Sequence, residues 1–247
     1  MAPKNETVGD PLAQQIEFIS NLFTNGNLRK KYLSLIIDNL KVWTGCECVG
    51  IRIIAQDGSM PYDSFVGFSF EFWENENWLS VNTHQCCCTR IATGMPDPFD
   101  RQILTEKGSL WTNDLSGFCK NIPETEASRY RCKCLEFGFA SLAVIPLKHR
   151  GRVIGLIHLA DSRKGLFPED TIVLLESASA VIGEIIMRYR AEDGLKEKEE
   201  TLRAGSAGIK ACAQSILPTC NSAEQQKILA VLQEKIEALE SHLATGG

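Results

Sequence analysis

Two apolar stretches joined by a short glycine-containing turn constrain the fold of this chain more than any other feature. The stretches FASLAVIPLKH (139–149) and VIGLIHLADS (153–162) are rich in β-branched residues, and the tripeptide RGR connects them. Two such runs separated by a short turn are typical of a β-hairpin. A second pair, CVGIRII (48–54) and YDSFVGF (62–68), is separated by a turn that contains QDGSM. The sequence therefore predicts a β-sheet that includes two strand pairs.

Helical periodicity flanks these strands along the chain. Apolar residues recur at spacings of three and four between residues 14 and 43 and again between 168 and 190, which is the pattern of an amphipathic helix. Pro168, followed by two acidic residues, suits the start of the second helix because the helix dipole favours negative charge there. Together these elements predict an α+β domain over residues 14–190, preceded by a flexible segment at 1–13.

Residues 191–247 have a different character. The stretch EDGLKEKEETLRAG is highly charged and reads as a solvated helical linker. Beyond it, apolar residues alternate steps of three and four, which is the spacing of a coiled-coil seam; they are Leu229, Leu232, Ile236, Leu239 and Leu243. This terminal helix either packs on its own domain or mediates contact with a second copy or a partner.

Composition narrows the classes of function. The net charge of -5 provides no basic surface for nucleic acid or an anionic membrane, and no run of about 20 apolar residues could span a membrane. The first residues lack the apolar core of a signal peptide, so we expect a cytoplasmic protein. In that reducing compartment ten cysteines are not expected to form a disulfide framework. Metal binding, thiol redox chemistry and plain burial remain open for them.

Six of the cysteines form three C-x-C pairs, at 46 and 48, 86 and 88, and 132 and 134. In an extended segment, residues i and i+2 share a face, so each pair could present two sulfurs to one site. The surroundings are expected to be loops or strand edges, which favour this geometry. Three adjacent thiols are not expected to point the same way, so Cys87 is predicted to be a bystander between Cys86 and Cys88.

Several stretches, in order, carry a resemblance to a known family. The chain resembles the GAF domain of bacterial multi-sensor histidine kinases and LuxR-type regulators, over about residues 30–190, in the segments GCECVGIRI (45–53), CCC…G (86–94), LTEKGSLWTNDL (104–115), RYRCKC through GLIHLAD (129–161) and LFPEDTIVLLESASAVIG (166–183). The resemblance implies a PAS-like fold, with a central antiparallel sheet, helices packed on one face and a ligand cavity on the other.

The same resemblance implies a set of ligands. The cysteine-containing subgroup has a thiol in a GCE motif, a CxC pair and a thiol in an RxRC motif, which here correspond to Cys46, Cys86, Cys88 and Cys134. Four thiolates suit zinc or an iron–sulfur cluster. Thr89 stands where the family has glycine, and the extra cysteines make the assignment ambiguous. Possible additional ligands are Cys48, Cys87, Cys119, Cys132 and His84. For a ligand cavity the candidates are His158 and Trp111, and either could instead complete the core.

A sensor is the function that the resemblance implies. The GAF domain would bind a metal or small molecule and pass the signal through its flanking helices, with a homodimer formed through the terminal helices. Because the residues after 190 are too few for a kinase ATPase unit or a complete DNA-binding effector, we expect a downstream signalling partner in trans, or a truncated regulator of transcription. Enzymatic activity is not expected. The alternatives are a thiol redox enzyme similar to the free methionine sulfoxide reductases, whose GVCG signature is absent here, and a ligand-free interaction module.

Overall fold

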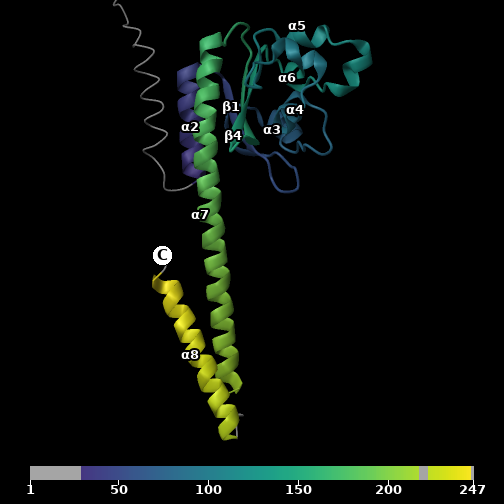
Figure 1. Cartoon of the computed structure of the whole chain (residues 1–247). Helices are drawn as coiled ribbons and strands as arrows, with labels where there is room; N and C mark the ends of the chain where they lie inside the picture. Colours follow the sequence, from purple (N-terminus) through teal and green to yellow (C-terminus); the bar gives the residue numbers. More distant parts are fainter. Residues whose placement is uncertain (1–28, 217–221, 246–247) are drawn as a thin grey trace, which may run out of the picture. The chain divides into compact units, whose positions relative to one another are not determined.

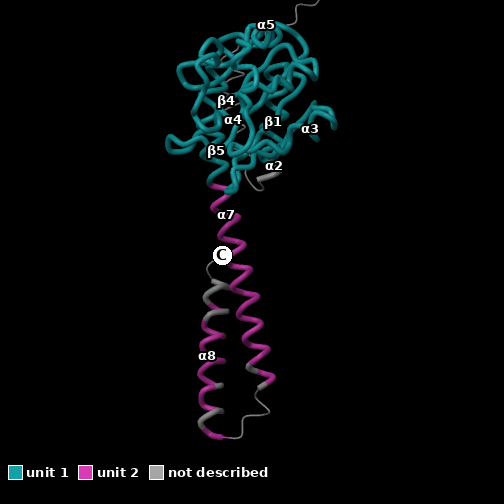
Figure 2. Tube along the Cα trace, turned by 90° about the vertical axis from the view of Figure 1, so that its right-hand side faces the viewer, with its two compact units in different colours: residues 1–187 teal, residues 188–247 magenta. Residues whose placement is uncertain are grey.

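The computed structural model describes residues 29–216 and 222–245. The chain divides into two compact units, residues 1–187 and residues 188–247, which Figure 2 colours separately. The flexible segment expected at 1–13 lies outside the described residues, as does the first part of the helical stretch expected from residue 14.

The first unit is built on a five-stranded antiparallel sheet with the order β2-β1-β5-β4-β3. Both predicted strand pairs are confirmed, since β1 pairs with β2 and β4 pairs with β5. The strands are β1 (Cys48–Ile53), β2 (Tyr62–Val66), β3 (Leu110–Thr112), β4 (Ser141–His149) and β5 (Arg152–Asp161). The β4–β5 turn has positive φ at Arg150 (48°) and Gly151 (77°), which is the backbone of a type I′ turn and matches the twist of a hairpin.

Helices cover both faces of this sheet (Figure 1). Two of them, α2 (Arg29–Thr44) and the first part of α7 (Glu169–Ile216), lie side by side on one face. Gly183 lets α7 approach the sheet closely, because a Cβ there would lie 2.4 Å from the carbonyl oxygen of Lys148 in β4. The other face carries the short helices α3 (Phe70–Glu76), α4 (Cys87–Thr93), α5 (Leu115–Lys120) and α6 (Lys133–Glu136), with the 3-10 helices η1 (Pro98–Ile103) and η2 (Glu124–Arg129).

The register of the strands decides which side chains meet the short helices. Cys48, Leu142 and Val144 belong to the apolar cluster that also contains Cys86 and other residues of the short helices. Because alternate strand residues point to opposite faces, their neighbours along the strands point toward α2 and α7. We call the side of the sheet that bears Cys48 and Val144 the cysteine face.

The second unit contains the rest of α7 and the helix α8 (Ala223–Thr245), which runs back beside that part of α7. The charged stretch expected as a helical linker is helical and belongs to α7. Of the predicted seam residues, Ile236 is buried and Leu232 is exposed, while the side chains of Leu229, Leu239 and Leu243 lie outside the described residues. Across the described parts of the chain, every helix is too short or too polar to span a membrane.

Candidate functional site

The three adjacent cysteines form a cluster at the start of α4. Cys86 is the N-cap residue with an extended backbone (φ -145°, ψ 154°), and Cys87 begins the helix. The Sγ atoms of Cys86, Cys87 and Cys88 all lie within 4.8 Å of one another. The expectation that three adjacent thiols do not point the same way is therefore wrong, because the change from extended to helical backbone turns the three side chains together. We call these three residues the cysteine triplet.

Thr89 holds this turn in place. Its hydroxyl accepts a hydrogen bond from the backbone N–H of Cys86 at 3.1 Å and lies 2.9 Å from the carbonyl oxygen of His84. A side chain that returns to the N-cap in this way stabilises the first turn of a helix. The residue that departs from the family's glycine thus fixes the geometry of the cysteine triplet.

A small cavity with a volume of about 30 Å³ lies against Cys86 and Cys87 of the triplet. Five cysteines from three segments line it: Cys86, Cys87, Cys119, Cys132 and Cys134. The other lining residues are apolar except for Glu76, Tyr130, Arg131 and Lys133. A space of this size holds a water molecule or an ion, whereas drug-sized ligands occupy pockets of about 300 Å³ or more. We call it the cysteine cavity.

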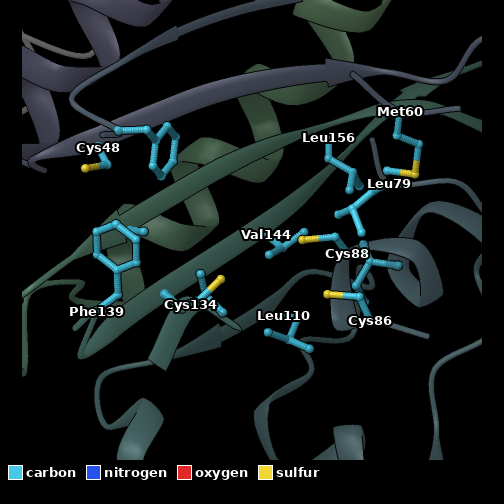
Figure 3. Close-up of a cluster of buried hydrophobic side chains, with 14 of the residues drawn as sticks. Cys48, Met60, Leu79, Cys86, Cys88, Leu110, Cys134, Phe139, Val144 and Leu156 are labelled. Atoms are coloured by element: carbon cyan, nitrogen blue, oxygen red, sulfur yellow. The ribbon is translucent and has the colours of Figure 1, made fainter. Parts of the chain in front are cut away.

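The close-up in Figure 3 shows how the thiols are arranged on the cysteine face. Cys86 and Cys88 lie next to each other near Val144, while Cys48 lies well apart from them. Cys134 is buried in the same apolar cluster. Of the four ligands that the resemblance implies, the structure brings Cys86, Cys88 and Cys134 into one cluster.

Protonation of the triplet is governed by hydrogen bonds between its sulfurs. The thiols of Cys87 and Cys88 donate to the sulfur of Cys86, which holds the pKa of Cys86 well below its usual range. The pKa values of Cys87 and Cys88 are raised well above the usual value for cysteine, and the largest cause is the hydrogen bond of each thiol to Cys86. Within the triplet, Cys86 is therefore the residue on which a thiolate is most favoured. Such a set of sulfurs is a soft donor group.

Cys46 lies outside this cluster. Its thiol donates toward the carbonyl oxygens of Cys48 and Ala160, each at 3.3 Å. Burial raises the pKa of Cys46 to about 12 and that of Cys48 to about 11. Neither residue lines the cysteine cavity. Both thiols thus behave as buried, protonated side chains in this arrangement.

The other candidates have diverse positions. The half-buried His84 accepts a hydrogen bond at Nδ1 from the backbone N–H of Ser80 at 3.1 Å and does not line the cavity. Trp111 pairs in register with Ala143 and is the immediate neighbour of Leu110, a cavity residue, so alternation places Trp111 on the opposite face. Cys132 is the N-cap residue of α6. Of the three C-x-C pairs, those at 86 and 88 and at 132 and 134 thus lie at helix starts, whereas Cys46 precedes β1 and Cys48 begins it.

His158 completes a buried polar network instead of opening onto the cavity. Its Nδ1 lies 2.7 Å from the hydroxyl of Tyr62, and its Nε2 lies 3.9 Å from Sγ of Cys134. Burial lowers the pKa of His158 to about 3, so the ring is neutral. The guanidinium of Arg52 lies 3.6 Å from the centre of the Tyr62 ring and donates to the carbonyl oxygens of Met60 and Glu76.

Sequence reasoning missed Arg52 and Glu76. Arg52 is fully buried in an otherwise apolar strand. A charged residue inside an apolar stretch of sequence is unusual, and this could have identified Arg52 as a candidate. Glu76 pairs with Arg131 at 2.7 Å between Oε1 and Nη2. Burial and, after it, the negative charge of Cys86 raise the pKa of Glu76 to about 7, against the opposing effect of Arg131. The sequence offered no equivalent signal for Glu76, because its partner is distant in the chain.

A second ion-pair network holds α4 to the segment beside the cavity. Arg90 makes a two-pronged pair with Asp100, at 2.6 Å and 2.8 Å, and donates to the carbonyl oxygen of Arg129 at 2.7 Å. Arg129 also pairs with Asp97. The Arg90 guanidinium lies 4.3 Å from the centre of the Tyr130 ring. These contacts position Tyr130 on the cavity wall.

The family follows from a comparison of the whole domain. The family model described as the GAF domain matches residues 31–186, which is more than half of the chain. The chain therefore belongs to the GAF domain family, whose fold is of the sensor type. A search of curated proteins returned no match to its sequence.

Solved structures share the fold at low sequence identity. The GAF domain of the phosphoenolpyruvate-protein phosphotransferase from Acinetobacter has a TM-score of 0.54 and 11% identity, covering 74% of this chain and 97% of that one. The free methionine-R-sulfoxide reductase from Neisseria meningitidis, in complex with its substrate, has a TM-score of 0.54 and 14% identity, covering 78% and 99%. The corresponding phosphotransferase domain from Coxiella burnetii has a TM-score of 0.52 and 12% identity, covering 74% and 96%. At these identities the likeness establishes the fold alone.

Proposed function

We propose that this chain is a sensory GAF protein whose signal is a thiophilic metal ion, with Zn²⁺ as the best match. The ligands would be the cysteine triplet, Cys86 to Cys88, together with Cys134. The observation that carries the proposal is the approach of three sulfurs to within 4.8 Å of one another at the start of α4. Thiolates are the preferred ligands of structural zinc.

The spacing of the sulfurs favours a single ion over an iron–sulfur cluster. Four sulfurs placed about 2.3 Å from a tetrahedral zinc lie about 3.8 Å from one another, which the triplet can reach with small side-chain movements. In a cluster the cysteines are distributed over several irons, so their sulfurs lie farther apart. Zinc or a similarly soft ion is therefore the proposed cofactor.

The size and charge of the cavity support an ion as the ligand. A cavity of about 30 Å³ suits an ion better than an amino acid, which favours the sensor over a reductase of free methionine sulfoxide. Arg131 and Lys133 lie on the cavity wall, where they offset the negative charge of a thiolate-bound ion. Free thiols in this number are suited to the reducing cytoplasm, where we place the protein.

The output is proposed to pass through the sheet to α7. Cys134 lies just before β4, and α7 packs closely on the carbonyl oxygen of Lys148 in β4 at Gly183. A shift of β4 on metal binding would therefore displace α7. The helix continues to Ile216, and its far part would act on a downstream signalling protein, as in histidine kinases or LuxR-type regulators of transcription.

A second copy of the chain is the proposed partner of α7. Three large apolar side chains are exposed on this helix at a spacing of seven: Leu195, Leu202 and Ile209, with exposed fractions of 66%, 52% and 54%. A spacing of seven residues keeps side chains on one face of a supercoiled helix. This stripe would be buried in a homodimer formed through the terminal helices.

Cobalt titration tests the metal site. The full chain, purified without oxygen and stripped with a chelator, is titrated with Co²⁺ and the absorption spectrum is recorded. We expect one Co²⁺ per chain, with the charge-transfer absorption of thiolate ligands and the visible bands of a tetrahedral ion, and displacement by Zn²⁺.

The matched variants are Cys88→Ser, which removes a proposed ligand, and Cys212→Ser, which removes an exposed thiol on α7. The first should lose the tetrahedral spectrum and the second should keep it. Absence of thiolate-to-cobalt absorption in the native chain would refute the proposed function, as would its survival in a variant that lacks the whole triplet.

A further inference from the structure

Two cysteines outside the proposed ligand set lie in close contact. The Sγ atoms of Cys119 and Cys132 are 2.7 Å apart. This is closer than unbonded sulfurs normally approach, and it is about 0.7 Å longer than the disulfide bond length of about 2.05 Å. Both residues are half-buried, so a small oxidant in solution can reach them.

The backbone at Cys132 is also unusual. Cys132 has a φ of 45°, and only one other non-glycine residue among those the structure describes, Arg150, has a positive φ. Arg150 belongs to a hairpin turn that requires this conformation, whereas Cys132 is the N-cap residue of α6. Residues held in this region are strained and are enriched at functional positions.

We infer that Cys119 and Cys132 form a reversible disulfide that senses hydrogen peroxide. One of the two sulfurs loses its proton and, as a thiolate, attacks an oxygen of the peroxide, so the O–O bond breaks and a sulfenic acid forms. The hydroxide that leaves takes up the released proton and becomes water. The other sulfur then attacks the sulfenic sulfur, so the S–O bond breaks, the S–S bond forms and a second water leaves. Two thiols and one peroxide give one disulfide and two waters, and a thiol reductant reverses the change.

The disulfide would close the segment of residues 120–131 into a loop. This segment carries η2 and two residues of the cavity wall, Tyr130 and Arg131. Arg131 is already paired with Glu76, which also lines the cavity. Oxidation would therefore restrain the outer wall of the cysteine cavity. The pair shares no residue with the proposed metal ligands, so the inference stands or fails separately from the metal site.

Disulfide mapping tests the inference. The reduced full chain is treated with one equivalent of hydrogen peroxide, the remaining thiols are alkylated, and peptides are analysed by mass spectrometry without reduction. We expect the peptides of Cys119 and Cys132 to be joined in most molecules, and dithiothreitol to separate them.

Two variants complete the test. In Cys119→Ser the sulfenic acid on Cys132 has lost its partner, so it should be trapped by dimedone, while Cys212→Ser should form the disulfide as the native chain does. The inference is overturned if Cys119 and Cys132 remain free after Cys212 is oxidised. It is also overturned if the disulfides formed join these residues mainly to Cys86, Cys87 or Cys134.

Discussion

Two pairs of cysteines in this protein have the same C-x-C spacing and opposite chemical environments. Cys46 precedes β1, and its thiol donates toward two backbone carbonyl oxygens. Cys86 caps α4, and its sulfur receives hydrogen bonds from the thiols of Cys87 and Cys88. The pKa of Cys46 is raised to about 12 by burial, whereas the pKa of Cys86 is held well below its usual range.

The difference shows that burial alone does not make a cysteine inert. Cys46 and Cys86 are both buried, with exposed fractions of 1% and 6%. Burial disfavours a thiolate, and hydrogen bonds donated to it favour it. Of these two residues, only Cys86 has thiol donors directed at its sulfur, so we expect Cys86 to be the more reactive of the two. The following predictions test this contrast, from the largest expected effect to the smallest.

Alkylation rates give the largest contrast. Raising the pKa of Cys46 from the ordinary 9.0 to about 12 reduces its thiolate fraction at neutral pH about 1000-fold. In a pulse of iodoacetamide at pH 7.5, read by mass spectrometry, Cys46 should therefore label at least about 1000-fold more slowly than Cys86. In denaturant both should label at similar rates, which is the control. Equal rates in the native chain would contradict the contrast.

Single substitutions in the two pairs should have different effects on the affinity for Zn²⁺. Loss of an outer-shell partner of a metal already lowers affinity about 10- to 100-fold, so Cys86→Ser should weaken Zn²⁺ binding by at least about 100-fold. Cys46→Ser should change it by less than about 3-fold, because Cys46 does not line the cavity. Competition with a chromophoric chelator measures both affinities. A comparable loss in both variants would instead support the four-ligand set with Cys46.

Burial also disfavours the charged form of an imidazole, that of His158. Its pKa is about 3 in the folded chain and about 6.5 when unfolded. Between these values the unfolded chain binds more protons, so the contribution of His158 to the free energy of unfolding decreases as pH falls from 6.5 toward 3, by at most about 1.4 kcal/mol per pH unit. Urea denaturation at pH 6.5, 5.5 and 4.5 should show a shallower loss of stability in His158→Gln than in the native chain.

The control for this prediction is Tyr62→Phe. It removes the hydroxyl that lies 2.7 Å from His158 and leaves the imidazole buried. This variant should lower the free energy of unfolding at every pH while keeping the native slope. Glu76 titrates in the opposite direction, because its raised pKa makes the folded chain bind more protons between about 4.5 and 7. The contribution of His158 is therefore measured as the difference in the free energy of unfolding between variant and native chain at each pH, in which the contribution of Glu76 cancels.

Truncation of Cys46 should have the smallest effect. Cys46→Ala removes a buried sulfur and its hydrogen bonds, which should lower the free energy of unfolding by about 1 kcal/mol. Urea denaturation measures this change in the reduced, metal-free chain. A loss of metal binding in this variant without a loss of stability would show that Cys46 acts at the site after all.

Much of the fold could be predicted from the sequence because it is encoded by local patterns. Apolar β-rich runs joined by short turns around 139–162 and 48–68 predicted both strand pairs, and spacings of three and four predicted the helices on either side. The resemblance to GAF domains rested on the same segments and is confirmed. Residues 14–28 and several side chains of α8 are not described, so the predictions for them stay untested.

The candidate site depended on information that neighbouring residues do not contain. By itself the sequence determined that the chain is a GAF domain with a cysteine-rich middle. Only the tertiary structure decided that Cys46 lies apart, that Cys87 joins its neighbours, and that Cys119 meets Cys132. The reason is that a thiol's chemistry depends on the atoms around its sulfur. Those atoms come from helix starts and strands far apart in the chain, which are brought together by the packing of α4, α5 and α6 on the cysteine face.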